Sequence, residues 1–296
     1  MLNDTELEKL RKAGKIAAHA VQLGMDMVDD NVKLYDVAEE VEGYIRSHGA
    51  KPAFPCNLSI NEVAAHYTPT PKDKLRFEVG DVVKVDAGAH IDGFVGDTAG
   101  TVEVRTKNYT HLIESAKKAR DIVMEFIGDG CQLKDIGRAV DSSIRSDGYR
   151  PIANLSGHQI VQYMLHAGLS IPNYDDGNTE NVKKGMIIAV EPFATNGAGE
   201  IRPGKASNIY RIVRERQIED PDLKIFFEDL KAEVSTFPFC ERWLSDPKAS
   251  QKVNKLMRHG LISSYTQCIE VKGGCVTQWE HTVYIEGKRA EITTLL

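Results

Sequence analysis

The chain of 296 residues has few cysteines, no long apolar segment and no excess of basic residues. Its five cysteines are widely spaced and include no Cys-x-x-Cys pair, which argues against a disulfide framework and against a zinc ribbon. No segment approaches the roughly 20 apolar residues that would cross a bilayer. The formal net charge is −6, so we expect no surface for DNA. These absences leave an ordinary globular protein that can bury a sizeable core.

The N-terminal segment, residues 1–20, is charged and amphipathic. It has no apolar stretch of the kind that a signal peptide requires. We therefore expect a cytoplasmic protein with no membrane partner.

An internal repeat is the main organisational feature. Residues 32–52 align without a gap on residues 131–151, and both copies have apolar residues at helical spacing, then glycine and proline. A further helical pattern precedes each copy, over 4–28 and over 109–127. The sequence therefore predicts a pair of helices that is used twice.

The strands that follow the helices are repeated as well. In the alignment Asp86 corresponds to Glu191, and Asp97 corresponds to Glu280. Two such units cannot easily bury their apolar faces alone. We therefore expect one α+β domain over residues 1–296 with pseudo-two-fold symmetry, in which the hairpins form a mainly antiparallel sheet and the helices cover one face.

The second hairpin carries an insertion. Asp86 and Asp97 are 11 positions apart, whereas Glu191 and Glu280 are 89 positions apart. The extra residues contain helical patterns with Asp-Pro at two starts, followed by a pattern of strand, Gly-Gly turn and strand. We expect residues 200–274 to form an inserted, mostly helical subdomain.

The four repeated acids are expected to meet at the centre of the sheet. If the chain turns at residues 92–93, Asp86 and Asp97 point to the same face, because side chains alternate along a strand. The repeat brings Glu191 and Glu280 to the same place. A lone acid near a hairpin is usually a turn or surface residue, but four buried carboxylates are hard to explain without divalent cations.

A histidine in the loop after the second helix pair, His158, would add one imidazole to the four carboxylates. An oxygen-rich site with one nitrogen donor suits Mn²⁺, Fe²⁺, Co²⁺ or Zn²⁺. On chemistry alone, His66 and His166 are equally good candidates for this place.

The sequence around these residues resembles the pita-bread family, which includes methionine aminopeptidases, prolidases, aminopeptidase P and creatinase. Its strings are similar to those of type II methionine aminopeptidases of the short archaeal form, in order along the chain: KPAFPCNLSINEVAAHYTP, VDAGAHIDGFVGDTA, NLSGHQIVQYMLHAG, AVEPFATNGAG, FPFCERWL and QWEHTVYI. The insertion is typical of type II. Trp279, where the family commonly has phenylalanine, leaves the ligands untouched.

The resemblance implies a fold, two metal ions and a set of ligands. The pita-bread fold would hold two divalent ions, Co, Mn, Fe, Zn or Ni. One ion would bind Asp86, Asp97 and Glu280, and the other would bind Asp97, His158, Glu191 and Glu280. A water or hydroxide between the ions would be the nucleophile, with Glu191 as the proton shuttle.

The resemblance also implies roles outside the metal ligands. His166 is similar to the histidine that contacts the scissile amide, and His66 to the one near the substrate N-terminus. Candidates for the methionine pocket and its rim are Phe54, Ile209, Pro238 and Tyr265. For these four residues, packing in the core explains their presence equally well.

The implied activity is removal of the initiator methionine from nascent polypeptides and peptides, with preference for a small second residue. We expect a monomer, and the sequence leaves contact with the ribosome open. One alternative is an X-Pro dipeptidase or aminopeptidase P-like hydrolase, which shares the metal ligands. Another is a non-enzymatic binding protein of the proliferation-associated type, against which the presence of all five ligands counts.

Overall fold

Each half of the repeat begins with two helices, which are followed by short strands. The computed structural model describes residues 1–296. The first half contains α1 (Asp4–Met27), α2 (Leu34–Ser47), β1 (Lys51–Pro52), β2 (Asn57–Ile60), β3 (Val63–Ala65), β4 (Val82–Ile91) and β5 (Phe94–Glu103). The second half begins with α3 (Thr110–Phe126), α4 (Leu133–Ser146), β6 (Arg150–Pro151), β7 (Ser156–Ile160), β8 (Ser170–Pro172), β9 (Ile187–Val190) and β10 (Phe193–Thr195). The four helices predicted from the repeat are confirmed.

The long β4–β5 hairpin follows the register that its turn dictates. Asp92 and Gly93 both have positive φ, 49° and 84°, as a two-residue hairpin turn requires. Gly88 pairs with Asp97, so Asp97 lies diagonally across from Asp86, on the same face. The two carboxylates therefore converge as predicted.

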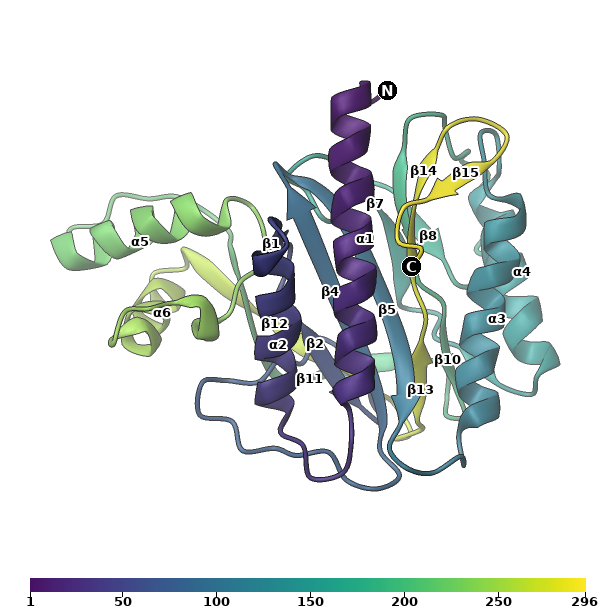
Figure 1. The fold of residues 1–296 in the computed structure, drawn as a ribbon, viewed down its shortest axis with the longest axis horizontal. Coiled ribbons are helices and arrows are strands. Elements are labelled where there is room, and N and C mark those ends of the chain that lie inside the picture. The colour runs from purple at the N-terminus through teal and green to yellow at the C-terminus, as the bar shows by residue number, and fades with distance from the viewer.

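The other face of this hairpin packs against helices. The residues of β4 that alternate with Asp86 belong to one apolar cluster with α1 and α2, and they are Val83, Val85, Ala87 and Ala89. Figure 1 shows α1 and α2 lying across β4 and β5. Helix α1 approaches β5 closely, because a Cβ atom on Gly96 would lie 2.3 Å from the Cα atom of Gly14. This contact leaves the opposite face of the strands free for a site.

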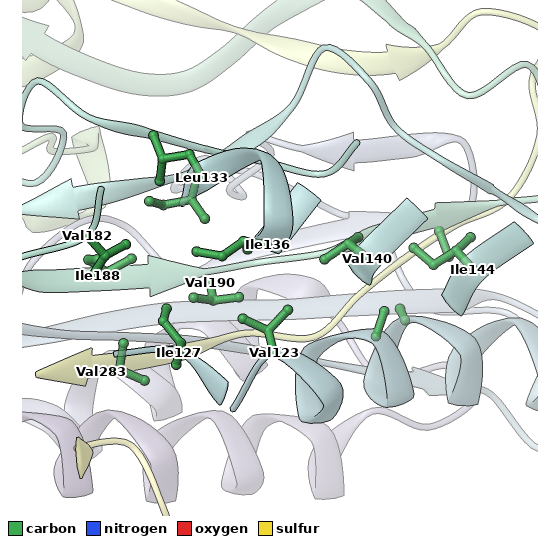
Figure 2. Packing of buried hydrophobic residues seen from close by; sticks show 14 of the residues in the cluster. Val123, Ile127, Leu133, Ile136, Val140, Ile144, Val182, Ile188, Val190 and Val283 are labelled. Carbon is green, nitrogen blue, oxygen red and sulfur yellow. The ribbon is translucent and has the colours of Figure 1, made fainter. Parts of the chain in front are cut away.

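The second half buries an equivalent cluster. Ile188 and Val190 of β9 pack with side chains of α3 and α4, as Figure 2 shows. Val283 joins the same cluster from a later strand, β14 (His281–Ile285). Because side chains alternate along a strand, Glu191 and Glu280 are directed away from these helices.

The two halves meet where β5 lies beside β14. The strands pair antiparallel throughout and fall into four hydrogen-bonded groups. At the junction, the Thr282 hydroxyl accepts from the Asp97 amide at 2.8 Å and donates to the Asp97 carbonyl at 2.7 Å. The Thr98 hydroxyl donates to the Glu280 carbonyl at 2.7 Å. Threonine hydroxyls therefore hold the strands that carry Asp97 and Glu280 side by side.

The insertion contains a ribbon as well as helices. Its elements are β11 (Ile201–Ile212), α5 (Pro221–Val234), the 3₁₀ turn η1 (Glu241–Trp243), α6 (Ala249–Arg258) and β12 (Ile262–Glu270). Strand β12 pairs with β11 and also with β3, so the ribbon is attached to the first half. Helices α5 and α6 extend beyond the sheet in Figure 1.

The strands expected on either side of the Gly-Gly turn are present, but they do not pair with each other. Strand β13 (Val276–Gln278) pairs with β10 instead, and the chain ends with β14 and β15 (Ala290–Ile292). The Glu270 carboxylate redirects the chain, because it accepts from the amides of Lys272 at 2.7 Å and Gly274 at 2.8 Å. No helix of the chain combines the length and apolarity that crossing a membrane needs.

Candidate metal centre

Each of the five residues predicted as metal ligands lies on a different strand or next to its end, and all five line one cavity. Asp86 lies on β4, Asp97 on β5, His158 on β7, Glu191 directly after β9 and Glu280 directly before β14. The cavity has a volume of about 220 Å³. The tightest group within it is Asp97, His158 and Glu280, whose ligand atoms lie within 4.8 Å of one another.

His158 and Gln278 connect the carboxylates. The Nε2 atom of His158 lies 3.5 Å from Oδ2 of Asp97 and 3.7 Å from Oε1 of Glu191. The side-chain amide of Gln278 donates to Glu191 at 3.4 Å and to Glu280 at 3.3 Å. These contacts fix the directions in which the two glutamates point.

Several oxygen atoms of the cluster have no hydrogen-bond partner. Oδ1 of Asp86, Oδ1 of Asp97 and Oε1 of Glu280 are buried and unpartnered. No lysine or arginine side chain lies within ion-pair distance of these acids, and only the imidazole of His158 does. Buried polar atoms are normally paired, so these three unpartnered oxygen atoms are the strongest indication that the cluster binds cations.

Burial acts on the protonation of every group in the cluster. It raises the pKa of Asp97 to about 7, and it raises the pKa values of Asp86, Glu191 and Glu280 well above the usual range, with neighbouring acids adding to the effect. Burial lowers the pKa of His158 to about 4, so its imidazole is neutral at pH 7. A neutral imidazole and several carboxylates are a donor set that fits divalent metal ions.

Two further histidines, His66 and His166, line the same cavity. His166 is exposed as a whole residue, but its ring lies 4.4 Å from the ring of His158, and desolvation of the ring and the neighbouring cationic groups lower its pKa, so it is neutral at pH 7. His66 follows β3 with a positive φ of 64°, a strained conformation for a residue with a side chain. Its Nδ1 atom lies 3.3 Å from the Thr266 carbonyl oxygen.

The four residues predicted for the methionine pocket also line this cavity, and they are Phe54, Ile209, Pro238 and Tyr265. Phe54 and Ile209 are 7% and 4% exposed, so they form a mostly dry wall. Gly88 makes room for this wall, because a Cβ atom there would lie 2.5 Å from the Phe54 ring. The eleven predicted site residues therefore share one cavity, and their individual roles stay predictions.

Sequence reasoning missed residues that carry no charge. Gln278 could have been found, because it precedes Glu280 by only two positions and therefore points to the same face of an extended chain. Asn57 pairs with Asp86 across β2 and β4, which the sequence of neither strand reveals. Other uncharged lining residues are Ala65, Asn154, Leu155, Ser156, Leu165 and Phe193.

Comparison with known proteins places the chain in a family. Residues 8–286 match metallopeptidase family M24, and the chain belongs to this family. It is 41% identical over 294 residues to a methionine aminopeptidase of Archaeoglobus fulgidus, covering 99% of this chain and 100% of that protein. A methionine aminopeptidase of Thermococcus kodakarensis is also 41% identical over 294 residues, covering 98% and 99%.

A solved structure supports the fold. The crystal structure of methionine aminopeptidase from Thermotoga maritima superposes with a TM-score of 0.73 at 24% identity, covering 100% of this chain and 98% of that chain. The α+β pita-bread fold expected from the sequence is therefore confirmed.

Proposed function

We propose that this protein is a methionine aminopeptidase that removes the N-terminal methionine from nascent polypeptides and peptides. The observation that carries the proposal is the set of unpartnered carboxylate oxygens of Asp86, Asp97 and Glu280, which face His158 at the end of a cavity with an apolar wall. The identity of about 41% with methionine aminopeptidases over nearly the whole chain supports it.

The proposed site holds two divalent ions, of Co, Mn, Fe, Zn or Ni. The ligands would be Asp86, Asp97 and Glu280 for one ion, and Asp97, His158, Glu191 and Glu280 for the other. When bound, such ions act as Lewis acids and make water a nucleophile at neutral pH. The number of buried carboxylates supports two ions, because a single divalent charge would leave four acids undercompensated.

The side chains of the chain itself would position the substrate and move protons. Glu191 is the proposed proton carrier between the attacking water and the leaving amine. Gln278 supports this role, since its amide orients Glu191 at 3.4 Å. His166, neutral at pH 7, can donate a hydrogen bond to the oxygen of the scissile carbonyl. His66 would contact the substrate near its N-terminus.

The shape of the cavity supports a preference for methionine. Methionine is unbranched and polarizable, so it fits an apolar wall such as that of Phe54 and Ile209 without a charged partner. Residues 200–274 contribute Ile209, Pro238 and Tyr265, and we propose that this inserted subdomain completes the pocket. The second residue of the substrate would lie against the metal ligands and His166, which favours a small side chain.

The proposal extends to the setting in which the enzyme works. We propose a cytoplasmic monomer whose substrate is a nascent polypeptide with an N-terminal methionine. Co-sedimentation with ribosomes, with and without a nascent chain, tests whether the ribosome is a second partner.

The test is a metal titration of the metal-free protein with activity measured at each step. Release of methionine from Met-Ala-Ser should rise with added metal and level off at two ions per chain. Ala-Pro peptides serve as the comparison, because cleavage of Ala-Pro in preference to Met-Ala-Ser would favour the X-Pro hydrolase instead. Met-Lys and Met-Phe peptides should be cleaved poorly, and equal kcat/KM for them would contradict the proposed second-residue preference.

A further inference from the structure

The ribbon of the insertion carries an unpaired cation next to the cavity. Arg211 on β11 is exposed and makes no ion pair with any acidic side chain. Its Nε atom donates to the hydroxyl of Ser263 at 3.3 Å, and its guanidinium carbon lies 5.2 Å from the centre of the Tyr265 ring. Ser263 is also its partner in the β11–β12 register. Backbone pairing and ring stacking therefore hold this guanidinium in place without neutralising it.

Tyr265 connects Arg211 to the cavity. Its ring lines the cavity and lies edge-on to the ring of His66, with 5.2 Å between the ring centres. The positive charge of Arg211 is also close enough to contribute to the lowered pKa of His166. Arg211 thus stands beside the part of the cavity where both histidines lie.

This part of the cavity is its opening. The acids at the inner end are buried, with Asp97 3% and Glu280 1% exposed. His166 and Asn154 are exposed, and Tyr265 is half-buried. When the first residue of a peptide is bound at the inner end, the rest of the peptide must extend outward past these three residues, which form the rim of the cavity. An extended chain advances about 3.3 Å per residue, so the residues after the second one pass the rim.

We propose that Arg211 determines specificity by binding a carboxylate of the substrate on the C-terminal side of the scissile bond. This inference rests on the proposed aminopeptidase function. The carboxylate can be the C-terminus of a short peptide or the side chain of an aspartate or glutamate. Arginine suits this task, because its planar guanidinium binds carboxylates through two parallel hydrogen bonds while it stacks on an aromatic ring.

The charge of the protein makes such a cation useful. The chain has a net charge of −6. Even when two divalent ions offset the four cavity acids, this overall negative charge repels an anionic substrate as it approaches the site. A cation at the opening offsets this repulsion for substrates whose negative charge comes to rest beside it.

The first experiment compares peptides of increasing length as free acids and as C-terminal amides. The substrates are Met-Ala-Ser, Met-Ala-Ser-Ser and Met-Ala-Ser-Ser-Ser, assayed with the metal-loaded enzyme. For at least one length, amidation should lower kcat/KM by about threefold in the wild type, mainly through KM, as expected for a solvent-exposed charge pair. The length at which the effect is largest gives the residue that lies beside Arg211.

Three variants assign the effect to Arg211. In Arg211→Ala the free acid and the amide should be cleaved equally well. Arg211→Lys keeps the charge and should retain part of the difference. Arg202→Ala is the matched control, because Arg202 is exposed on the same strand and makes no ion pair, side-chain hydrogen bond or cation–π contact with a residue of the cavity. It should behave as the wild type.

A second set of substrates separates the two sources of the carboxylate. Met-Ala-Ser-Glu-amide and Met-Ala-Ser-Gln-amide differ only in the charge of one side chain. Further pairs place this Glu or Gln at other positions of the peptide. A preference for glutamate that Arg211→Ala removes would assign the subsite to acidic side chains as well as to C-termini.

The outcomes distinguish the two proposals. Methionine release that responds to amidation and to Glu/Gln exchange identically in the wild type and in Arg211→Ala would overturn the subsite while leaving the aminopeptidase intact. An equal loss in Arg202→Ala would also overturn it, since general surface charge would then explain the effect. No release of methionine from any peptide by the wild type would overturn both.

Discussion

Two groups of buried carboxylates in this protein differ in what compensates their charge. Glu42 of α2 is 1% exposed, and four groups donate to it. The Cys56 amide donates at 2.9 Å, Arg242 donates twice, at 2.7 and 2.9 Å, and the Trp243 indole donates at 2.5 Å. Among the cavity acids, Asp97 and Glu280 are about as deeply buried, at 3% and 1% exposed, but no arginine, lysine or indole reaches them.

The difference shows how the chain uses a buried negative charge. The desolvation cost of Glu42 is offset by the chain itself, and Arg242 also donates to the Pro69 carbonyl at 2.8 Å and to the Thr68 hydroxyl at 2.9 Å. This ion pair fastens the insertion to α2 and to the segment that follows His66. The chain does not offset the desolvation cost of the cavity acids, so this cost remains until a ligand binds. This is expected of a site that binds cations.

The largest effect is expected from removing a charge that two metal ions would share. Glu280→Gln should lose metal and lower kcat/KM by roughly a thousandfold or more, since metal ions contribute several kcal/mol to the transition state. The melting temperature of the metal-free variant should not fall, because an uncompensated charge has been removed. Metal analysis, kinetics and thermal denaturation check the three expectations. Retention of two metals with full activity would contradict the assignment of Glu280.

The compensated pair should respond in the opposite way. Arg242→Ala leaves Glu42 buried without its countercharge and should lower the free energy of unfolding by about 3 kcal/mol. Arg46→Ala is the matched control, because Arg46 lies 3.6 Å from the same carboxylate but is exposed, and its loss should cost less than about 1 kcal/mol. Urea titration of both variants measures the difference. Equal stability of the two would show that burial of the pair is not what matters.

The comparison also explains which features could be predicted from the sequence. The hairpin register follows from Asp92-Gly93 and from the alternation of apolar residues on β4, so the convergence of Asp86 and Asp97 was predictable. These are local rules of turns and strands. The internal repeat extended the prediction to the equivalent strands of the second half.

The features that could not be predicted depend on contacts between distant segments. The compensation of Glu42 depends on Arg242, 200 positions away, and no local pattern marks this pair. The sequence predicts the Gly-Gly turn after β12 but not the path of the chain, which depends on the pairing of β12 with β3 and of β13 with β10. In both cases the decisive contacts join segments that are far apart in the sequence.

A smaller effect is expected from a residue of the cavity that is not a proposed ligand. His166→Ala should lower kcat about a hundredfold, the size found when one donor to a developing oxyanion is removed. Metal content and thermal stability should not change, because the imidazole does not hold the cluster together. Loss of metal in this variant would instead make His166 a ligand. The cavity would then depend on metal through one more residue, unlike Glu42, whose charge is offset by the chain itself.

The smallest expected effect is a difference in how folding stability depends on pH, which distinguishes the cavity acids from Glu42. Without metal, the folded-state pKa of Asp97 is about 7, above its value in the unfolded chain, so the folded protein binds more protons and loses stability as pH rises through this range. Buried histidines with lowered pKa values act in the opposite direction, because the unfolded chain still binds protons near pH 6.5; they are His66, His90, His158, His166 and His281. The double variant Asp97→Asn/Glu280→Gln, treated with chelator, keeps these histidines, so its difference from the wild type isolates the cavity acids.

Between pH 6.5 and 8 the melting temperature of the metal-free wild type should fall by about 2 °C relative to the double variant, since each unit of pKa shift is worth about 1.4 kcal/mol. Added metal should reverse this relative slope, because the ions bind the deprotonated carboxylates. A metal-free wild type that loses no stability relative to the double variant across this window would mean that the cavity acids are compensated within the chain, as Glu42 is.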